Sequence, residues 1–167
     1  MAIKQTWKKS PFAKPRTKKV TLAVVHSMAE NLKLDDGPKD AHSFLLSIKL
    51  GAHSLLTPDG THIRMADTND QLSHAKGFNQ ISFGIEFLVP GVHDYDSFLK
   101  AIAETKKPPY TEAQYASGGE WLALRCKEHG LTWDNVKGHV DIDPTRKFDP
   151  GKAFDWAKLK RYFDAAF

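Results

Sequence analysis

Short apolar runs recur along this chain, and their length and composition predict strands. Each run holds four to nine mostly apolar residues and is bounded by glycine, proline or polar residues, which is typical of strands buried in a sheet. The runs are 20–25, 53–56, 61–65, 81–89 and 136–140. Asp59-Gly60 between the second and third runs is a turn signal, so these two runs are expected to form a hairpin. His26 directly follows the first run, and His139 lies in the last.

Apolar residues at helical spacing predict the longest helix over 111–129. Thr111 and Gln114 have the spacing of a capping box at its start, and Gly130 is a typical C-terminal cap. The pair Gly118-Gly119 predicts either a local weakening of this helix or a close packing contact.

Two shorter helices are predicted on either side of the longest one. The first covers 41–50, after a turn at 36–38 whose proline is expected at the helix start. The second begins after Asp155, which is expected to cap it. Its inward face is expected to consist of Trp156, Leu159, Phe163 and Phe167. Strands that alternate with helices predict an α/β fold, in which a mixed central β-sheet is flanked by helices in a single domain.

Composition is compatible with one domain and excludes several classes of protein. The chain has 167 residues, of which 41% are hydrophobic, so it can bury a substantial core. The single cysteine, Cys126, excludes an internal disulfide framework and a cysteine-rich zinc site. Because no run of 18 apolar residues and no secretory signal is found, we expect no membrane span and a protein that stays in the cytoplasm until it is released.

Positive charge is concentrated at the start of the chain. The net charge is +4, and residues 1–19 contain seven Lys or Arg and no acid. We therefore divide the chain into a basic N-terminal arm, 1–19, laid on a domain over 20–167. Such segments are usually solvated tails, and the functional alternative is attraction to a polyanion, for example an anionic polymer of the cell envelope. A nucleic acid is not the expected partner, since the aromatic strand pattern of single-strand binders is missing.

The segment 138–151 contains part of a metal-ligand set. It carries His139, Asp149 and, two residues before the aspartate, Lys147. An imidazole and a carboxylate suit a divalent metal such as zinc, and the lysine would bring a fixed charge close to whatever the metal polarises. His26 at a strand end is more often structural when taken alone. Beside His139 and Asp149 it becomes the third ligand of an open catalytic site.

Three further residues are candidates for chemistry or binding. Glu86 lies in an apolar strand, so an inward-facing carboxylate would have a raised pKa and could act as a general base, whereas an outward-facing one would be ordinary. His74 and Asn79 lie in a loop-like segment, where they could contact substrate or serve the loop alone. Four other histidines are interpreted as structural or surface residues: His42, His62, His93 and His129.

Several short motifs follow one another in the order of a known family. They cover 24–27, 51–53, 59–61, 73–79, 82–86, 138–142 and 146–151. Over residues 20–165 the chain resembles the type-2 N-acetylmuramoyl-L-alanine amidases, and Ser73-His74-Ala75-Lys76-Gly77-Phe78-Asn79 is most similar to small phage endolysins.

The resemblance implies a site and a reaction. It implies one zinc ion per chain on His26, His139 and Asp149, and hydrolysis of the amide between N-acetylmuramic acid and L-alanine of peptidoglycan. It also implies catalytic roles for Glu86 and Lys147. Some branches have a catalytic tyrosine where this chain has Ala52, which we interpret as leaving that role to Glu86.

Three functions are compatible with this resemblance. The first is an endolysin that degrades host peptidoglycan, which small size and the basic arm favour. The second is a cytosolic amidase that recycles anhydro-muropeptides, and the third is a peptidoglycan-recognition module without catalysis. Because all three ligand positions are filled, catalysis is favoured, in a protein expected to be a monomer.

Overall fold

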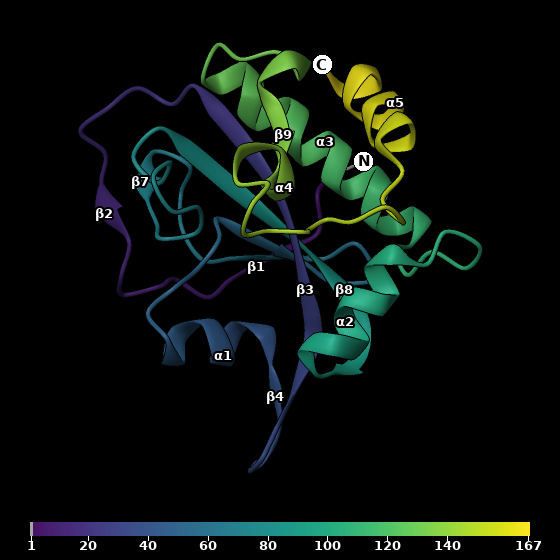
Figure 1. The fold of residues 1–167 in the computed structure, drawn as a ribbon. Helices are drawn as coiled ribbons and strands as arrows, with labels where there is room; N and C mark the ends of the chain where they lie inside the picture. Colours follow the sequence, from purple (N-terminus) through teal and green to yellow (C-terminus); the bar gives the residue numbers. More distant parts are fainter. Residues whose placement is uncertain (1) are drawn as a thin grey trace.

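The strands β3 (Leu22–Leu34) and β8 (Ser82–His93) run parallel through the centre of a seven-stranded mixed sheet (Figure 1). This computed structural model describes residues 2–167. The strand order is β1-β6-β5-β8-β3-β4, and β9 also pairs with β3. The remaining strands are β1 (Gln5–Trp7), β4 (Gly37–Asp40), β5 (Ser54–Leu56), β6 (His62–Arg64) and β9 (Val136–Gly138), with β2 (Lys14–Pro15) and β7 (Asp70–Gln71) in a separate pair. The predicted α/β fold with a mixed sheet is confirmed.

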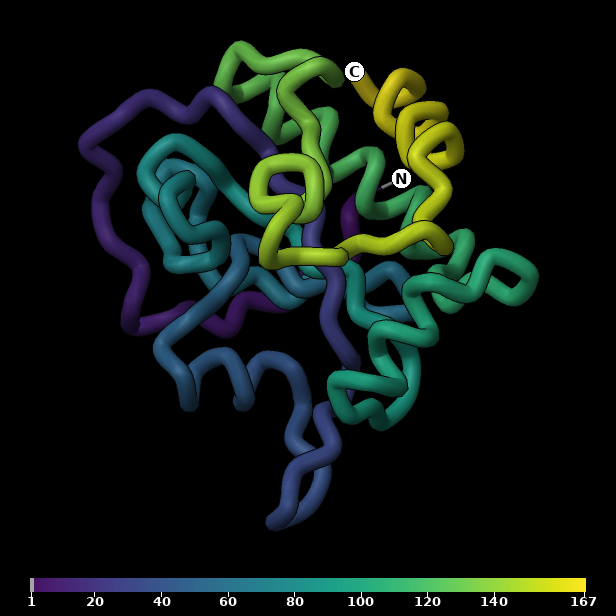
Figure 2. The backbone as a smooth tube through the Cα atoms, viewed as in Figure 1, coloured from purple at the N-terminus to yellow at the C-terminus, as the bar shows by residue number. Residues whose placement is uncertain are grey.

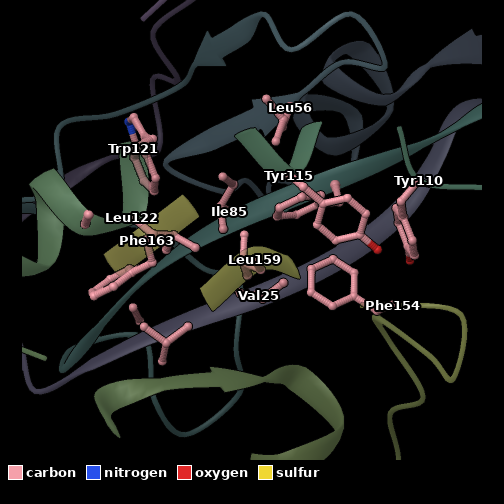
Figure 3. Packing of buried hydrophobic residues seen from close by; sticks show 14 of the residues in the cluster. Val25, Leu56, Ile85, Tyr110, Tyr115, Trp121, Leu122, Phe154, Leu159 and Phe163 are labelled. Carbon is pink, nitrogen blue, oxygen red and sulfur yellow. The ribbon is translucent and has the colours of Figure 1, made fainter. Parts of the chain in front are cut away.

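Helices cover the sheet on both faces. The larger core lies between one face and the helices α2 (Tyr95–Ala103), α3 (Glu112–Glu128) and α5 (Trp156–Ala166). Figure 3 shows part of this core, in which Val25 and Ile85 of the sheet pack with Leu122, Leu159 and Phe163 of the helices. A smaller core on the other face includes residues of α1 (Ala41–Ser47). Because side chains alternate along a strand, the residues between the core positions of β3 and β8 point to this second face.

The longest helix, α3, begins and ends as its sequence predicts. Thr111 and Gln114 form the capping box, and Gly130 has a φ of 68°, the left-handed conformation that glycine adopts at low cost. Gly118 and Gly119 mark close packing, because a Cβ on Gly118 would lie 2.6 Å from the ring of Phe87. Asp155 caps α5 by accepting a hydrogen bond from the backbone N–H of Lys158.

Two strands are longer than predicted. β3 continues eight residues past His26 to Leu34, and β8 continues through Pro90-Gly91 to His93. The two strands pair over most of this length, with an irregularity where Pro90 and Gly91 lie opposite Glu30. The prediction that the first strand ends at His26 and the second at Val89 was therefore wrong, because each strand supplies the other with backbone partners beyond the apolar run.

Several element boundaries also differ from the prediction. Pro38 lies in the edge strand β4 rather than at a helix start, a position where its missing N–H is tolerated. α1 ends at Ser47 because Lys49 takes a φ of 59° and Leu50 N–H returns to the Leu45 carbonyl. β9 ends at Gly138, so His139 begins the one-turn helix α4 (His139–Ile142). The structure also has α2, which was not predicted, and a short 3-10 helix at Trp133–Asn135.

The basic arm is an ordered part of the molecule. Figure 2 traces it in purple along the outside of the domain before it enters β3. β1 adds a parallel strand beside β6, and β2 pairs with β7. The Trp7 ring stacks on the guanidinium of Arg64, 4.7 Å away, which in turn lies over Trp121. Over residues 2–167, no helix combines the length and the apolar character needed to cross a membrane.

Candidate metal and catalytic site

The pairing of β3 with β8 places two of the predicted site residues side by side. His26 and Glu86 are register partners, so both side chains point to the face opposite α3 and α5. β9 pairs with β3 only as far as Gly138 opposite Val25, and the chain then turns into α4. His139 is therefore delivered next to His26 at the point where β9 ends.

Asp149 reaches the same place from the loop between α4 and α5. Its carbonyl accepts a hydrogen bond from the Val140 N–H, and the next carbonyl, that of Pro150, accepts one from the buried Tyr110 hydroxyl at 2.7 Å. Gly151 has a φ of 85° and packs so closely on Ile102 that a Cβ would overlap its carbonyl oxygen. This loop path requires a glycine at that position and fixes the carboxylate that precedes it.

Three donor atoms form a small triangle in the resulting cluster. The Nδ1 atoms of His26 and His139 are 2.9 Å apart, and Asp149 Oδ2 lies 3.5 Å from the first and 3.3 Å from the second. All three residues are buried, and each can offer one ligand atom to a shared ion. Ligand atoms bound at 2.0–2.1 Å around a tetrahedral zinc ion lie about 3.3 Å from one another. The edges of the triangle therefore fit zinc.

The surroundings keep these donors in their metal-binding forms. Burial lowers the pKa of His26, against the opposing effect of Asp149, and this favours the neutral imidazole that binds metals. Burial acts to raise the pKa of Asp149, but the contacts of its carboxylate with the imidazoles of His139 and His26 outweigh it and hold the pKa below its ordinary value. Asp149 Oδ2 also accepts the Ser27 backbone N–H at 3.2 Å.

Glu86 has the surroundings of a general base. Burial, followed by repulsion from Asp149, raises its pKa well above the ordinary value, and attraction to Lys147 opposes this rise. Among the residues described, its Oε2 is one of the buried polar atoms that has no hydrogen-bond partner. A carboxylate with a free oxygen and a raised pKa is available to accept and return a proton.

One pocket of about 300 Å³ contains both the donor cluster and the candidate catalytic groups. All five predicted metal-binding and catalytic residues line it: His26, Glu86, His139, Lys147 and Asp149. The positive charge of Lys147 opposes the raised pKa of Glu86 and adds to the lowering of the pKa of His26. The arrangement can bind a metal, exchange a proton and neutralise a developing negative charge.

His74 lines the same pocket but also touches a metal-ligand candidate directly. Its Nδ1 lies 2.9 Å from His26 Nε2, and its Nε2 lies 3.1 Å from the Ser82 hydroxyl. This contact was not predicted. The two imidazoles are 48 positions apart in the chain, and nothing in the sequence indicates that they meet.

Asn79 does not line the pocket. Its Oδ1 accepts the backbone N–H groups of His74 and Ala75, at 2.9 and 2.8 Å. The amide therefore closes the loop that carries His74, which is the loop role left open by the sequence.

The pocket extends into an apolar groove between α1 and α2. Exposed apolar side chains line it, among them Ile48, Leu50, Tyr95 and Phe148. The α2 wall was missed, although Asp94 followed by Ser97 is a capping signal before the apolar residues Phe98, Leu99 and Ile102. A groove of this form can hold a substrate much longer than its reacting bond.

Comparisons with known proteins identify the family to which the chain is similar. The sequence profile of the family described as N-acetylmuramoyl-L-alanine amidase matches residues 16–152. The curated 1,6-anhydro-N-acetylmuramyl-L-alanine amidase AmpD of Enterobacter cloacae is 29% identical over 168 residues, covering 87% of this chain and 82% of that protein. The AmpD of Haemophilus influenzae is 28% identical over 135 residues, covering 75% of this chain and 65% of that protein.

Solved structures share the fold. A selenomethionine derivative of AmpD superposes with a TM-score of 0.70 at 24% identity, covering 97% of this chain and 95% of that one. The endolysin N-acetylmuramoyl-L-alanine amidase LysCS of Clostridium intestinale gives 0.68 at 20% identity, covering 98% and 97%.

Proposed function

This chain belongs to the N-acetylmuramoyl-L-alanine amidase family, and from that premise we propose that His26, His139 and Asp149 bind one zinc ion and that Glu86 and Lys147 act beside it. The chain is thus an amidase, and its reaction is hydrolysis of the amide between N-acetylmuramic acid and L-alanine in peptidoglycan. The triangle of two imidazole nitrogens and one carboxylate oxygen supports zinc, which accepts both kinds of donor in tetrahedral geometry.

A zinc ion held by these donors supplies Lewis acidity, which makes water a nucleophile near neutral pH and polarises a carbonyl. Glu86 accepts the proton of the attacking water and delivers it to the departing alanine nitrogen. Its free Oε2 and raised pKa support this role. Ala52 is fully buried and carries no titratable group, so we assign to Glu86 the role that a tyrosine has in some branches.

Lys147 stabilises the oxyanion that forms when water adds to the carbonyl. Its ammonium is a fixed positive charge on the pocket wall, and it acts to lower the pKa of both Glu86 and His26. One well-placed donor to an oxyanion contributes about 3–4 kcal/mol to the stability of the transition state.

The substrate is bound along the apolar groove. His74 forms part of the wall beside the reacting bond, and Asn79 shapes that wall through the backbone of the loop. Tyr95 and Phe148 are the most exposed of the apolar side chains in the groove, at 63% and 57%, and offer flat faces to sugar rings.

We propose intact peptidoglycan as the substrate and an endolysin as the role, with the basic arm attracting the enzyme to anionic envelope polymers. The open groove and the exposed lysines on the arm support this reading. Lys4 pairs with Asp59, and five further lysines are exposed: Lys8, Lys9, Lys14, Lys18 and Lys19. Recycling of anhydro-muropeptides is the second candidate, favoured by the similarity to AmpD over 87% of the chain.

Three measurements test these proposals. Elemental analysis is expected to give one zinc per chain, and mass spectrometry of digested sacculi is expected to show new L-alanine amino termini. Rates on intact sacculi and on soluble anhydro-muropeptide are then compared. A large preference for sacculi supports the endolysin, whereas a preference for the soluble fragment supports recycling. Binding of sacculi without new amino termini would contradict catalysis.

The role of the arm is best tested by substitution. Deleting residues 1–19 would remove β1 and Arg16 together with the charge, so the five exposed lysines other than Lys4 are replaced by glutamine instead. We expect weaker pull-down on sacculi at low salt and no difference at high salt, where charge is screened. Equal pull-down at all salt concentrations would show that the arm does not bind the wall.

A further inference from the structure

Arg16 of the basic arm closes a long segment of the chain. Its guanidinium donates hydrogen bonds to four backbone carbonyls, at distances between 2.6 and 3.1 Å. The acceptors are Thr68, Asn79, Gln80 and Ser82. They lie at both ends of segment 68–82, so one planar group with a rigid fork of donors holds the two ends together.

This segment determines which nitrogen of His26 carries the proton. The Ser82 hydroxyl donates to the Phe78 carbonyl at 2.7 Å, so it accepts from His74 Nε2–H. His74 Nδ1 is then an acceptor, and His26 Nε2–H donates a hydrogen bond to it at 2.9 Å. The Nδ1 of His26, which faces His139 and Asp149, is left with a free lone pair.

Gly84 on β8 leaves space for the hydrogen bond between His26 and His74. A Cβ on Gly84 would lie 2.5 Å from His74 Nδ1 and 3.1 Å from His26 Nε2. The two imidazoles therefore meet in the space that a side chain at Gly84 would fill.

We propose that Arg16 is a positioning residue for the metal site. By closing segment 68–82 it holds Ser82 and His74 where they fix the tautomer and orientation of His26. This inference rests on the proposed zinc site, although its first consequence, a single tautomer of His26, belongs to the metal-free protein as well.

The test compares Arg16→Ala and Arg16→Lys with Lys18→Ala, which removes one exposed charge from the same arm. Zinc affinity is measured by competition with a chelator at fixed pH. Since loss of an outer-shell partner typically weakens metal binding about 10- to 100-fold, we expect a loss of about 10-fold for Arg16→Ala. Lys18→Ala should bind zinc like the parent protein. Arg16→Lys should lie between them, because an ammonium cannot span four carbonyls, and it replaces Arg16→Ala if that variant does not fold.

A second measurement does not depend on zinc. Nitrogen-15 NMR of the metal-free protein is expected to show His26 as the single Nε2–H tautomer, and a mixture in Arg16→Ala. If the parent protein binds no zinc, the zinc proposal fails while this comparison still tests Arg16. A single tautomer and unchanged zinc affinity in Arg16→Ala, even with a lower melting temperature, would overturn the inference.

The route through His74 is tested by combining substitutions. If Arg16 acts through His74, the double variant Arg16→Ala/His74→Ala should lose no more zinc affinity than His74→Ala alone. Losses that add would show that Arg16 reaches the site by another path and would overturn the proposal.

Discussion

At the scale of single residues, each of the three proposed zinc ligands is held by a different local device. His26 is oriented by a hydrogen bond from its far nitrogen to His74. His139 takes its place as the first residue of a helix that starts where β9 ends. Asp149 is fixed by the Ser27 backbone N–H. The Ser27 N–H bonds Asp149 Oδ2, the same oxygen that faces the cluster, but a carboxylate oxygen has a second lone pair, so all three donors remain available to the same ion.

Replacing Lys147 by alanine should affect catalysis far more than metal binding. The ammonium is proposed to stabilise the oxyanion and is not one of the three donors. We expect kcat to fall about 100- to 1,000-fold, with zinc still bound at one per chain. Near-normal turnover by Lys147→Ala would refute this role.

Replacing Glu86 by glutamine should remove proton transfer while keeping the size and shape of the side chain. The two side chains have nearly the same size, but the amide cannot accept the proton of the attacking water. We expect kcat to fall about 100- to 10,000-fold, with zinc content unchanged. Glu120→Gln, on α3 and away from the pocket, is the control for loss of one carboxylate. If the two variants are equally active, Glu86 is not the base.

The sequence predicted the residues of the site better than their partners. His26, Glu86, His139, Lys147 and Asp149 are found together because their residue types and motifs carry the chemistry directly. The support given by His74 and Arg16 depends on the closed shape of segment 68–82, which no periodicity encodes.

At the scale of elements, packing decided what the hydrophobic pattern left open. The capping box and the glycine cap of α3 are local features, so the sequence located them correctly. The lengths of β3 and β8 depend on pairing between segments far apart in the chain. The outer half of β3 contains polar residues, and that of β8 contains Pro90-Gly91. α2 was missed because its apolar face is short, although Asp94 signals its start.

Gly118→Ala tests the close packing of α3 on the sheet. Alanine favours a helix by about 1 kcal/mol over glycine. The new methyl group, however, would lie 2.6 Å from the Phe87 ring and 3.0 Å from Leu56. We expect overpacking to prevail and the free energy of unfolding in urea to fall by about 1–3 kcal/mol. A more stable variant would show that the helix can move away from the sheet at little cost.

At the scale of the whole molecule, two buried histidines make stability depend on pH. Burial lowers the pKa of His53 to about 3 and that of His62 to about 4, both from 6.5. Because the folded state disfavours their charged forms, their contribution is complete above pH 6.5 and is lost as the pH falls toward these values.

Urea unfolding of the metal-free protein at pH 7, 6 and 5 tests this dependence. Each imidazole should lower the free energy of unfolding by up to about 1.4 kcal/mol per pH unit below 6.5. His62→Gln should reduce the slope by about the share of one histidine. A free energy of unfolding that stays constant from pH 7 to 5 would contradict these pKa values.

β1 pairs in parallel with β6, a strand that is synthesised later, and this order of synthesis has a consequence for the assembly of the site. β1 leaves the ribosome before its partner β6 and before the carbonyls that Arg16 binds. His139 is synthesised 113 residues after His26, so the two imidazoles can meet only late in synthesis. A nascent chain therefore lacks one of the three proposed zinc ligands until translation has passed Asp149, so we expect no cleavage activity before that point.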